Sequence, residues 1–332
     1  MATQSRQAIA RANAIDLAEK CSLTASVVVC AYTEDRWLTI LSTVAAVQAQ
    51  MAIGDQLLII VDHNDGLLAR CRESLADCLI IPNHHHRGLS GARNTAVDEA
   101  VGSIIIFIDD DAVPLDGWLN ALRSPYGDQC IYGVGGLTTP VWHNGQPRWF
   151  PDEFLWVVGC SHRGLPTNSH PIRNLSGANM SFRRTTFDDL GGFAETMGRI
   201  GERPLGCEET EFSIRITQAN PDAVLLYEPS ARVEHHVAPQ RSSLGYFARR
   251  CWAEGISKAE VSRRVGRSSA LSMERQFVGQ VLTKGIWRGI RDIAGGDVWG
   301  GARALVMLFG LVVTSAGYCA GSLLRSAGGG EK

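Results

Sequence analysis

Four short apolar runs punctuate the first third of the chain. They read SVVVCA at Ser26–Ala31, QLLIIVD at Gln56–Asp62, CLIIP at Cys78–Pro82 and SIIIFID at Ser103–Asp109. Their apolarity is continuous and rich in β-branched residues, which is typical of strands buried on both faces of a parallel sheet. Helix-like segments lie between them, at Trp37–Gln50, Leu67–Ala76 and Ser90–Val101. This alternation predicts an α/β fold in which helices flank the sheet.

Polar clusters follow three of the predicted strands, at Thr33–Arg36, Asp62–Asp65 and Asp109–Asp111. In open α/β sheets, ligands bind beyond the carboxyl ends of the strands. Asp109 and Asp111 are spaced to approach one Mg²⁺ or Mn²⁺ ion, which relieves the repulsion between their charges. Magnesium usually binds through one or two carboxylates plus substrate phosphates, so the spacing indicates a phosphate-bearing substrate. The alternative is a solvated acidic turn that caps a helix over Pro114–Leu122.

A second acidic cluster, GCEETE, begins a helix-like segment at Gly206. Carboxylates in a first helical turn are favoured by the helix dipole, which gives a purely structural interpretation. A carboxylate within reach of an acceptor hydroxyl also serves as a general base. Glu208 and Glu209 are therefore candidates for that role, and the candidacy is stronger beside a metal site.

The C-terminal region contains 21 residues without a charge, from Ala304 to Leu324. This length suffices for a helix to cross the hydrocarbon core of a bilayer. More Lys and Arg residues precede the segment than follow it, which predicts that the main domain is cytoplasmic. The alternative is a buried core helix or a hairpin packed against the domain. The preceding VLTKGIWRGIRDI mixes bulky apolar and basic residues, as an interfacial helix does.

Composition excludes some classes of protein. The formal net charge of -2 over 332 residues lacks the basic excess of a nucleic-acid-binding protein. Nine cysteines without a C-x-x-C pair fit buried thiols in a reducing compartment. The N-terminus has no apolar core, so we expect a short amphipathic helix over residues 1–24 and no secretory signal.

Seven motifs occur in a fixed order between about Ala25 and Ala238. They are VVVCAYTEDR, IIVDHND, GLSGARNTAVDEAVGSIIIFIDDDAVPLDGWL, NLSGANMSFRR, GGF, GCEETEFSIRI and VEHHVAP. This series resembles the family 2 glycosyltransferases, which have the GT-A fold, a Rossmann-like mixed sheet flanked by helices. The resemblance implies a GT-A domain over residues 25–240. Around it, the apolar and polar patterns predict an N-terminal helix (1–24), a helical or interfacial extension (241–302), a transmembrane or membrane-associated helix (303–325) and a disordered tail (326–332).

The resemblance also implies a nucleotide site. Its residues follow the first strand, end the second strand or belong to GARN: Ala31, Tyr32, Glu34, Asp62 and Arg93. The family's DXD motif corresponds to Asp109-Asp110-Asp111. Asp111 would bind the metal directly, Asp109 would face the ribose or the waters of the metal, and Asp110 would shape the turn.

The family's Glu-Asp motif corresponds to Glu208-Glu209, which carries Glu at the usual Asp position. The resemblance implies Glu209 as the base, and the longer side chain leaves Glu208 as the alternative. A late histidine that holds metal or diphosphate in some relatives corresponds to His235 or His236. The implied reaction is inverting, with the acceptor hydroxyl attacking the anomeric carbon as the base removes its proton.

These implications together describe a metal-dependent inverting glycosyltransferase that uses Mg²⁺ or Mn²⁺ and a nucleotide-sugar, with UDP preferred. The apolar C-terminal segment predicts that the acceptor is a lipid-linked or cell-envelope glycan, at the cytoplasmic face of a bacterial inner membrane. One alternative is a sugar-phosphate nucleotidyltransferase, but the YTEDR loop lacks the glycines expected of its phosphate loop. Another is an inactive, membrane-anchored nucleotide- or glycan-binding protein, against which the intact Asp109, Asp111, Glu208 and Glu209 argue.

Two further features allow weaker interpretations. The tract His84-His85-His86 suits a metal site, although a solvated turn near the nucleotide is favoured by its place before GLSGARN. Four aromatic residues in one loop can form a platform for an acceptor sugar or pack in the core: Trp142, Trp149, Phe150 and Trp156.

Overall fold

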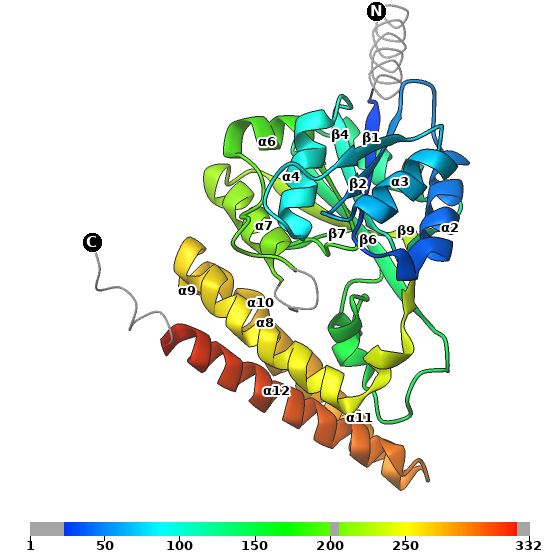
Figure 1. Ribbon diagram of the computed structural model, residues 1–332. Coiled ribbons are helices and arrows are strands. Elements are labelled where there is room, and N and C mark those ends of the chain that lie inside the picture. The colour runs from blue at the N-terminus through cyan, green and yellow to red at the C-terminus, as the bar shows by residue number, and fades with distance from the viewer. Residues whose placement is uncertain (1–22, 200–205, 324–332) are drawn as a thin grey trace, which may run out of the picture.

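The computed structural model describes residues 23–199 and 206–323. The expected N-terminal helix falls outside them except for residues 23 and 24, and so does the expected disordered tail. A mixed sheet with the strand order β3-β2-β1-β4-β8-β6-β9-β5 forms the centre of the described chain. Figure 1 shows this sheet above a group of long C-terminal helices.

The four predicted strands are confirmed, and they pair in parallel as expected. They are β1 (Ala25–Ala31), β2 (Gln56–Val61), β3 (Leu79–Pro82) and β4 (Ile104–Asp109). The remaining strands are β5 (Ala112–Pro114), β6 (Ile131–Trp142), β7 (His170–Pro171), β8 (Asn179–Arg183) and β9 (Val224–Val237). Strand β8 lies antiparallel to β4, which makes the sheet mixed. The long pair of β6 and β9 is parallel, and its far end, at Trp142 and Val237, packs in a separate apolar cluster.

Helices cover both faces of the sheet (Figure 1). On one face, α2 (Trp37–Gln48), α3 (Asp65–Ser74) and α5 (Trp118–Arg123) bury the side of β1 that carries Val27 and Val29. On the other, α4 (Leu89–Glu99), α6 (Arg184–Leu190) and α7 (Glu208–Ala219) bury Val28. Because both faces are buried, the strands are continuously apolar.

The helix expected over Pro114–Leu122 begins only at Trp118, so this prediction is wrong in its first turn. Ala112–Pro114 instead forms β5, which pairs with β9 so that Ala112 faces His235. Gly117, with φ of 81°, then turns the chain into α5. The three aspartates therefore precede a strand and do not cap a helix.

Short 3-10 turns and C-terminal helices complete the described chain. The turns are η1 (Glu34–Arg36), η2 (Ser124–Gly127), η3 (Asp152–Val158) and η4 (Pro239–Ser242). After them come α8 (Leu244–Val265), α9 (Arg267–Ala270), α10 (Ser272–Gln276), the π-helical turn η5 (Phe277–Leu282), α11 (Thr283–Ala294) and α12 (Trp299–Leu323). Figure 1 shows α12 running alongside α8 on the side away from the sheet.

Glycines allow α8 and α12 to approach closely. A Cβ atom on Gly317 of α12 would lie 2.3 Å from the carbonyl oxygen of Trp252, and one on Gly255 of α8 would lie 2.1 Å from that of Thr314. Real Cβ atoms do not come so near to backbone atoms, so the two helix backbones meet only because side chains are missing there. Helix α12 is therefore docked lengthwise on α8.

Helix α12 is also the one described helix that is long and apolar enough to cross a membrane, judged by length and composition. Only 28% of its most apolar stretch is buried. Its outer side exposes Leu305, Leu308, Phe309 and Val312. A core helix of a soluble domain buries most of its apolar side chains, so α12 has one docked face and one apolar face left uncovered.

Replacing Gly317 by Val is expected to destabilise the protein by about 1–3 kcal/mol, because the added side chain forces α12 away from the Trp252 carbonyl. Denaturant unfolding of the purified chain measures this loss. Ala316→Val is the matched control, since Ala316 is exposed on the same turn and should change stability by no more than about 0.5 kcal/mol. Equal stability of the two variants would contradict the docking of α12 on α8.

Candidate active site

The aspartate cluster lies where β4 ends and β5 begins. Asp109 is partly exposed, whereas Asp110 and Asp111 are buried. Pairing of β5 with β9 brings His235 to the same place, with its Nε2 atom 3.1 Å from Oδ1 of Asp111. One ligand atom each from Asp109, Asp111 and His235 lie within 4.8 Å of one another. Two carboxylates and an imidazole at this spacing can hold one divalent cation.

Two arginines also converge on Asp111. Arg36 of η1 places Nη2 3.1 Å from Oδ2 of Asp111 and pairs through Nη1 with Asp110, while Arg241 of η4 lies 3.4 Å from the same Oδ2. Burial alone would raise the pKa of Asp111, but His235 and Arg36 outweigh it and hold this pKa below the ordinary range. Asp111 is therefore a carboxylate that several positive groups surround.

The sequence interpretation missed both of these arginines as site residues. The sequence pattern places Arg36 only in the polar cluster after the first strand, and it gives Arg241 no role. The available signal for Arg241 was a basic residue in the loop directly after the histidine pair.

His235 and His236 take opposite sides of β9. Burial would lower the pKa of His235, but the neighbouring Asp111 outweighs this and raises it to about 10. His236 instead turns its ring toward His143, with ring centroids 5.6 Å apart, and only its backbone N–H donates to the Asp111 carbonyl, at 2.8 Å. Side chains alternate along a strand, so only one of the two imidazoles faces the aspartates.

Arg93 links the two acidic clusters. It is fully buried on α4 and its Nη1 donates to Oε1 of Glu208 at 2.7 Å. Its Nη2 donates to the carbonyl oxygen of Gly177 at 2.9 Å and lies 3.7 Å from Oδ1 of Asp109. A buried carboxylate needs such a partner to stay charged. Arg93 thus holds Glu208 and Asp109 in fixed relation.

Glu208 and Glu209 occupy the first turn of α7 but differ in environment. Glu208 is buried and engaged by Arg93, although its Oε2 atom has no hydrogen-bond partner. Glu209 is less buried and has no comparable ion pair among the described contacts. Burial, followed by the like charge of Glu208, raises the pKa of Glu209 to about 8. A carboxyl group with such a pKa accepts a proton more readily than an ordinary one.

A single large cavity connects these groups. It has a volume of about 1,220 Å³, and its lining includes Arg93, Asp109, Asp111, Glu209 and His235. The lining also includes Glu208 and the two arginines that contact Asp111. Both acidic clusters therefore open into the same space.

Five predicted nucleotide or motif residues are not part of this lining: Ala31, Tyr32, Glu34, Asp62 and Asp110. The carbonyl of Ala31 accepts from the N–H of Asp62 at 2.8 Å. The Asp62 carboxylate accepts from the backbone N–H of Gly88 and from the side-chain amide of Asn83. These contacts position the loops that follow β1 and β2.

Tyr32 and Glu34 make contacts on the adjoining loops. The carbonyl oxygen of Tyr32 accepts a hydrogen bond from the Asn64 side chain at 3.1 Å. Glu34 forms a half-exposed ion pair with Arg70, also at 3.1 Å. Ion pairs of this exposure contribute little to stability, so Glu34 retains an accessible carboxylate beside the cavity-lining Arg36.

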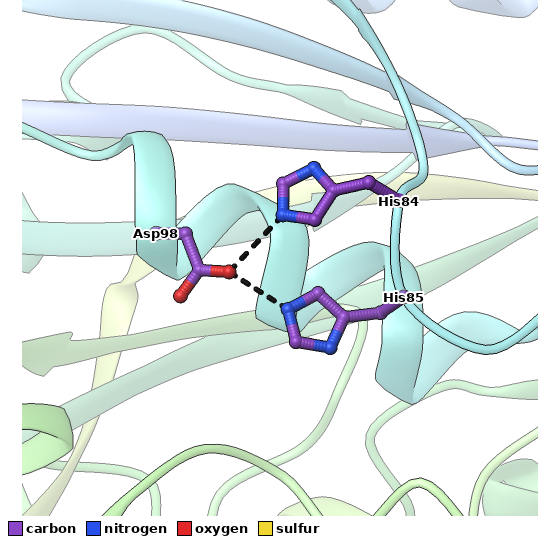
Figure 2. A group of neighbouring side chains, drawn as sticks. All are labelled: His84, His85 and Asp98. Atoms are coloured by element: carbon purple, nitrogen blue, oxygen red, sulfur yellow. Dashed lines mark hydrogen bonds and ion pairs between the residues drawn. The ribbon is translucent and has the colours of Figure 1, made fainter.

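The histidine tract forms a separate polar cluster outside the cavity lining. Figure 2 shows Nε2 of His84 and Nε2 of His85 pointing toward the same oxygen of Asp98, at 3.2 Å and 2.7 Å. On its other side, Nδ1 of His85 lies 2.7 Å from a carboxylate oxygen of Glu195. The tract thus joins the loop after β3 to the end of α4 by hydrogen bonds.

The aromatic loop packs largely in the core. Phe150 is buried, and Trp142 and Trp149 pack against the same cluster as Phe247. Trp156 of η3 alone among the four predicted aromatic residues lines the cavity.

The chain matches the model of the family "Glycosyl transferase family 2" over residues 26–191. It belongs to this family, as its motifs predict, and it is a glycosyltransferase. The fold is the expected GT-A type, with a mixed sheet flanked by helices.

Two relatives and one solved structure illustrate the similarity. The chain is 32% identical to the glucosyl-dolichyl phosphate glucuronosyltransferase of Haloferax volcanii, over 70% of this chain and 75% of the relative. It is 26% identical to the succinoglycan biosynthesis protein ExoM of Rhizobium meliloti, over 68% and 71%. The mannosyltransferase PcManGT of Pyrobaculum calidifontis, solved with GDP-Man and Mn²⁺, superposes with a TM-score of 0.54 at 16% identity, covering 92% of this chain and 88% of that one.

Proposed function

We propose that the protein is a metal-dependent inverting glycosyltransferase that moves a sugar from a nucleotide-sugar, with UDP preferred, to a hydroxyl group of a lipid-linked or cell-envelope glycan. The observation that carries the proposal is the convergence of Asp109, Asp111 and His235 with Glu209 on one cavity. The relative from Haloferax volcanii bears the name of an enzyme that acts on a dolichyl phosphate-linked sugar, which supports the choice of acceptor.

The residues present fit a divalent cation. Asp109, Asp111 and His235 would hold Mg²⁺ or Mn²⁺, because carboxylates and an imidazole suit such ions. A bound cation supplies positive charge that stabilises the departing nucleoside diphosphate. Arg36 already faces Asp111, so its guanidinium group is available to the diphosphate once a cation shares the carboxylate.

Glu209 acts as the general base in this proposal. It accepts the proton of the acceptor hydroxyl while the oxygen of that hydroxyl attacks the anomeric carbon. Glu208 positions Arg93, and through it the Asp109 carboxylate. The nucleoside would bind at the loops shaped by Ala31, Tyr32, Glu34 and Asp62. These loops lie beside the aspartate turn that contains Asp110.

The protein is further proposed to bind a membrane through its C-terminal helices, with the GT-A domain on the cytoplasmic side. The exposed apolar side of α12 supports membrane contact. The lengthwise docking of α12 on α8 favours a helix that lies on the bilayer surface over one that crosses it. An interfacial helix requires only one apolar face.

A thermal-shift screen tests the nucleotide and metal parts of the proposal. At about a hundredfold excess over its Kd, a specific nucleoside diphosphate with Mn²⁺ should raise the melting temperature by roughly 5 °C. EDTA should abolish the rise. The absence of a metal-dependent shift with UDP, GDP, TDP, CDP and ADP would overturn the proposal. Release of a nucleoside diphosphate from a nucleotide-sugar, with no pyrophosphate formed from a nucleoside triphosphate and a sugar phosphate, excludes the nucleotidyltransferase alternative.

A further inference from the structure

The large cavity has a second, apolar end that the proposed chemistry does not use. This end is walled by η5, through Phe277, Val278 and Val281, and by α12, through Leu311 and Tyr318. The volume of about 1,220 Å³ exceeds the range of about 300–1,000 Å³ that is usual for one small ligand. The cavity therefore has room for a second, apolar molecule beside the donor.

The helix that walls the apolar end also carries the exposed apolar face. Leu311 of α12 lines the cavity, whereas Leu305, Leu308 and Val312 on the same helix face outward. Helix α11 adds exposed Trp287 and further apolar side chains beside Lys284 and Arg291. Exposed apolar side chains next to a tryptophan and basic residues match the surface of an anionic bilayer.

The cavity lining also carries several positive charges. Arg199, Arg241 and Arg250 line the cavity together with Tyr246. Burial alone would raise the pKa of the Tyr246 phenol, but Arg241, Arg199 and Arg250 outweigh it and lower the pKa. Three guanidinium groups in one lining suit a phosphate, although Arg250 also lies 3.7 Å from Glu254 of the same lining. Arg241 also reaches Asp111, so this site adjoins the proposed metal.

We propose that the apolar end of the cavity binds the hydrocarbon chain of a lipid-phosphate acceptor, and that Arg199, Arg241 and Arg250 bind its phosphate. The chain enters from a bilayer on which α11 and α12 lie. This inference rests on the proposed function and deepens it, since it assigns a lipid phosphate, rather than a free glycan, as the carrier of the acceptor hydroxyl.

Calorimetric titration with farnesyl phosphate tests the chain site without any need for turnover. We expect the wild-type protein to bind farnesyl phosphate at least ~100-fold more tightly than inorganic phosphate, because the apolar chain leaves water. Val281→Asp should weaken farnesyl phosphate binding at least ~10-fold. Val101→Asp is the matched control, since Val101 is exposed and is not part of the lining. The affinity of this variant for farnesyl phosphate should equal that of the wild type.

Two results would overturn the inference: inorganic phosphate binding as tightly as farnesyl phosphate, or equal affinity of Val281→Asp and Val101→Asp for farnesyl phosphate. If Val281→Asp does not fold, Val278→Asp on the same turn replaces it. The nucleoside diphosphate thermal shift with Mn²⁺, measured on the same variants, separates the two proposals. If the wild-type protein shows no thermal shift with nucleoside diphosphate and Mn²⁺, the proposed function is rejected. The farnesyl phosphate result concerns the lipid site alone.

Vesicle sedimentation tests the membrane surface. The double variant Leu305→Asp/Val312→Asp should bind vesicles of phosphatidylglycerol and phosphatidylcholine at least ~10-fold more weakly than the wild type, because both side chains are exposed on α12. Its affinity for farnesyl phosphate in solution should not change. Vesicle binding equal to that of the wild type would overturn the assignment of this face to the bilayer.

Discussion

Asp111→Asn is expected to lower the rate of glycosyl transfer by about 1,000-fold, which corresponds to about 4 kcal/mol of transition-state stabilisation. The substitution keeps the shape of the side chain but removes the charge that His235, Arg36 and Arg241 surround. Without that charge the proposed cation loses its central ligand, and stabilisation of the leaving diphosphate is lost with it. Initial rates at saturating donor and Mn²⁺ measure the effect.

Two controls accompany Asp111→Asn. Asp116→Asn makes the same chemical change at an exposed position in the loop after β5, and it should leave the rate unchanged. Titration with Mn²⁺ in the presence of nucleoside diphosphate should show weaker metal binding for Asp111→Asn alone. A rate within tenfold of the wild type, from a folded Asp111→Asn protein, would exclude Asp111 as a metal ligand.

Glu209→Gln is expected to reduce kcat by about 1,000-fold or more while donor binding stays intact. General-base catalysis contributes typically 10²- to 10⁴-fold, and Glu209 is the carboxylate of the α7 turn that no arginine engages among the described contacts. The thermal shift caused by nucleoside diphosphate and Mn²⁺ should persist in this variant. Loss of the shift together with the rate would mean that Glu209 serves binding rather than proton transfer.

The pH dependence of kcat/KM provides an independent signature of the base. Burial and Glu208 raise the pKa of Glu209 to about 8, and only the deprotonated carboxylate accepts a proton. Activity should therefore rise with pH and level off above about 8. Glu208→Gln removes the like charge, so the rising limb should move to lower pH. A limb that stays in place in Glu208→Gln would assign the titration to another group.

The sheet could be predicted from sequence because its strands carry a local signal. The strands β1, β2 and β4 are buried on both faces, and this burial leaves continuous apolar runs in the chain, whereas the edge strand β3 is only partly buried. The helix start at Pro114 was wrong for a nonlocal reason. Residues 112–114 become a strand through pairing with β9, and no feature within the segment itself signals a partner so far along the chain.

The same distinction applies to the candidate site. Asp109, Asp111, Glu208 and Glu209 could be singled out because each pair stands in a short motif. Arg36 and Arg241 meet at Asp111 only because η1 and η4 fold over the sheet. Whether His235 or His236 faces the aspartates depends on the orientation of β9. The role of Arg93 as a partner of Glu208 likewise appears only when α4 and α7 lie together.

The pairing of β5 with β9 has a consequence for how this family member can change during evolution. Ala112 faces His235, and the side chains of β9 alternate between the interior and the surface. A slip of one residue would turn every side chain of the strand to the opposite face. A single insertion or deletion between Val233 and His235 would exchange the buried imidazole for a neighbouring side chain, so we expect homologues to keep this stretch free of length changes even where its sequence drifts.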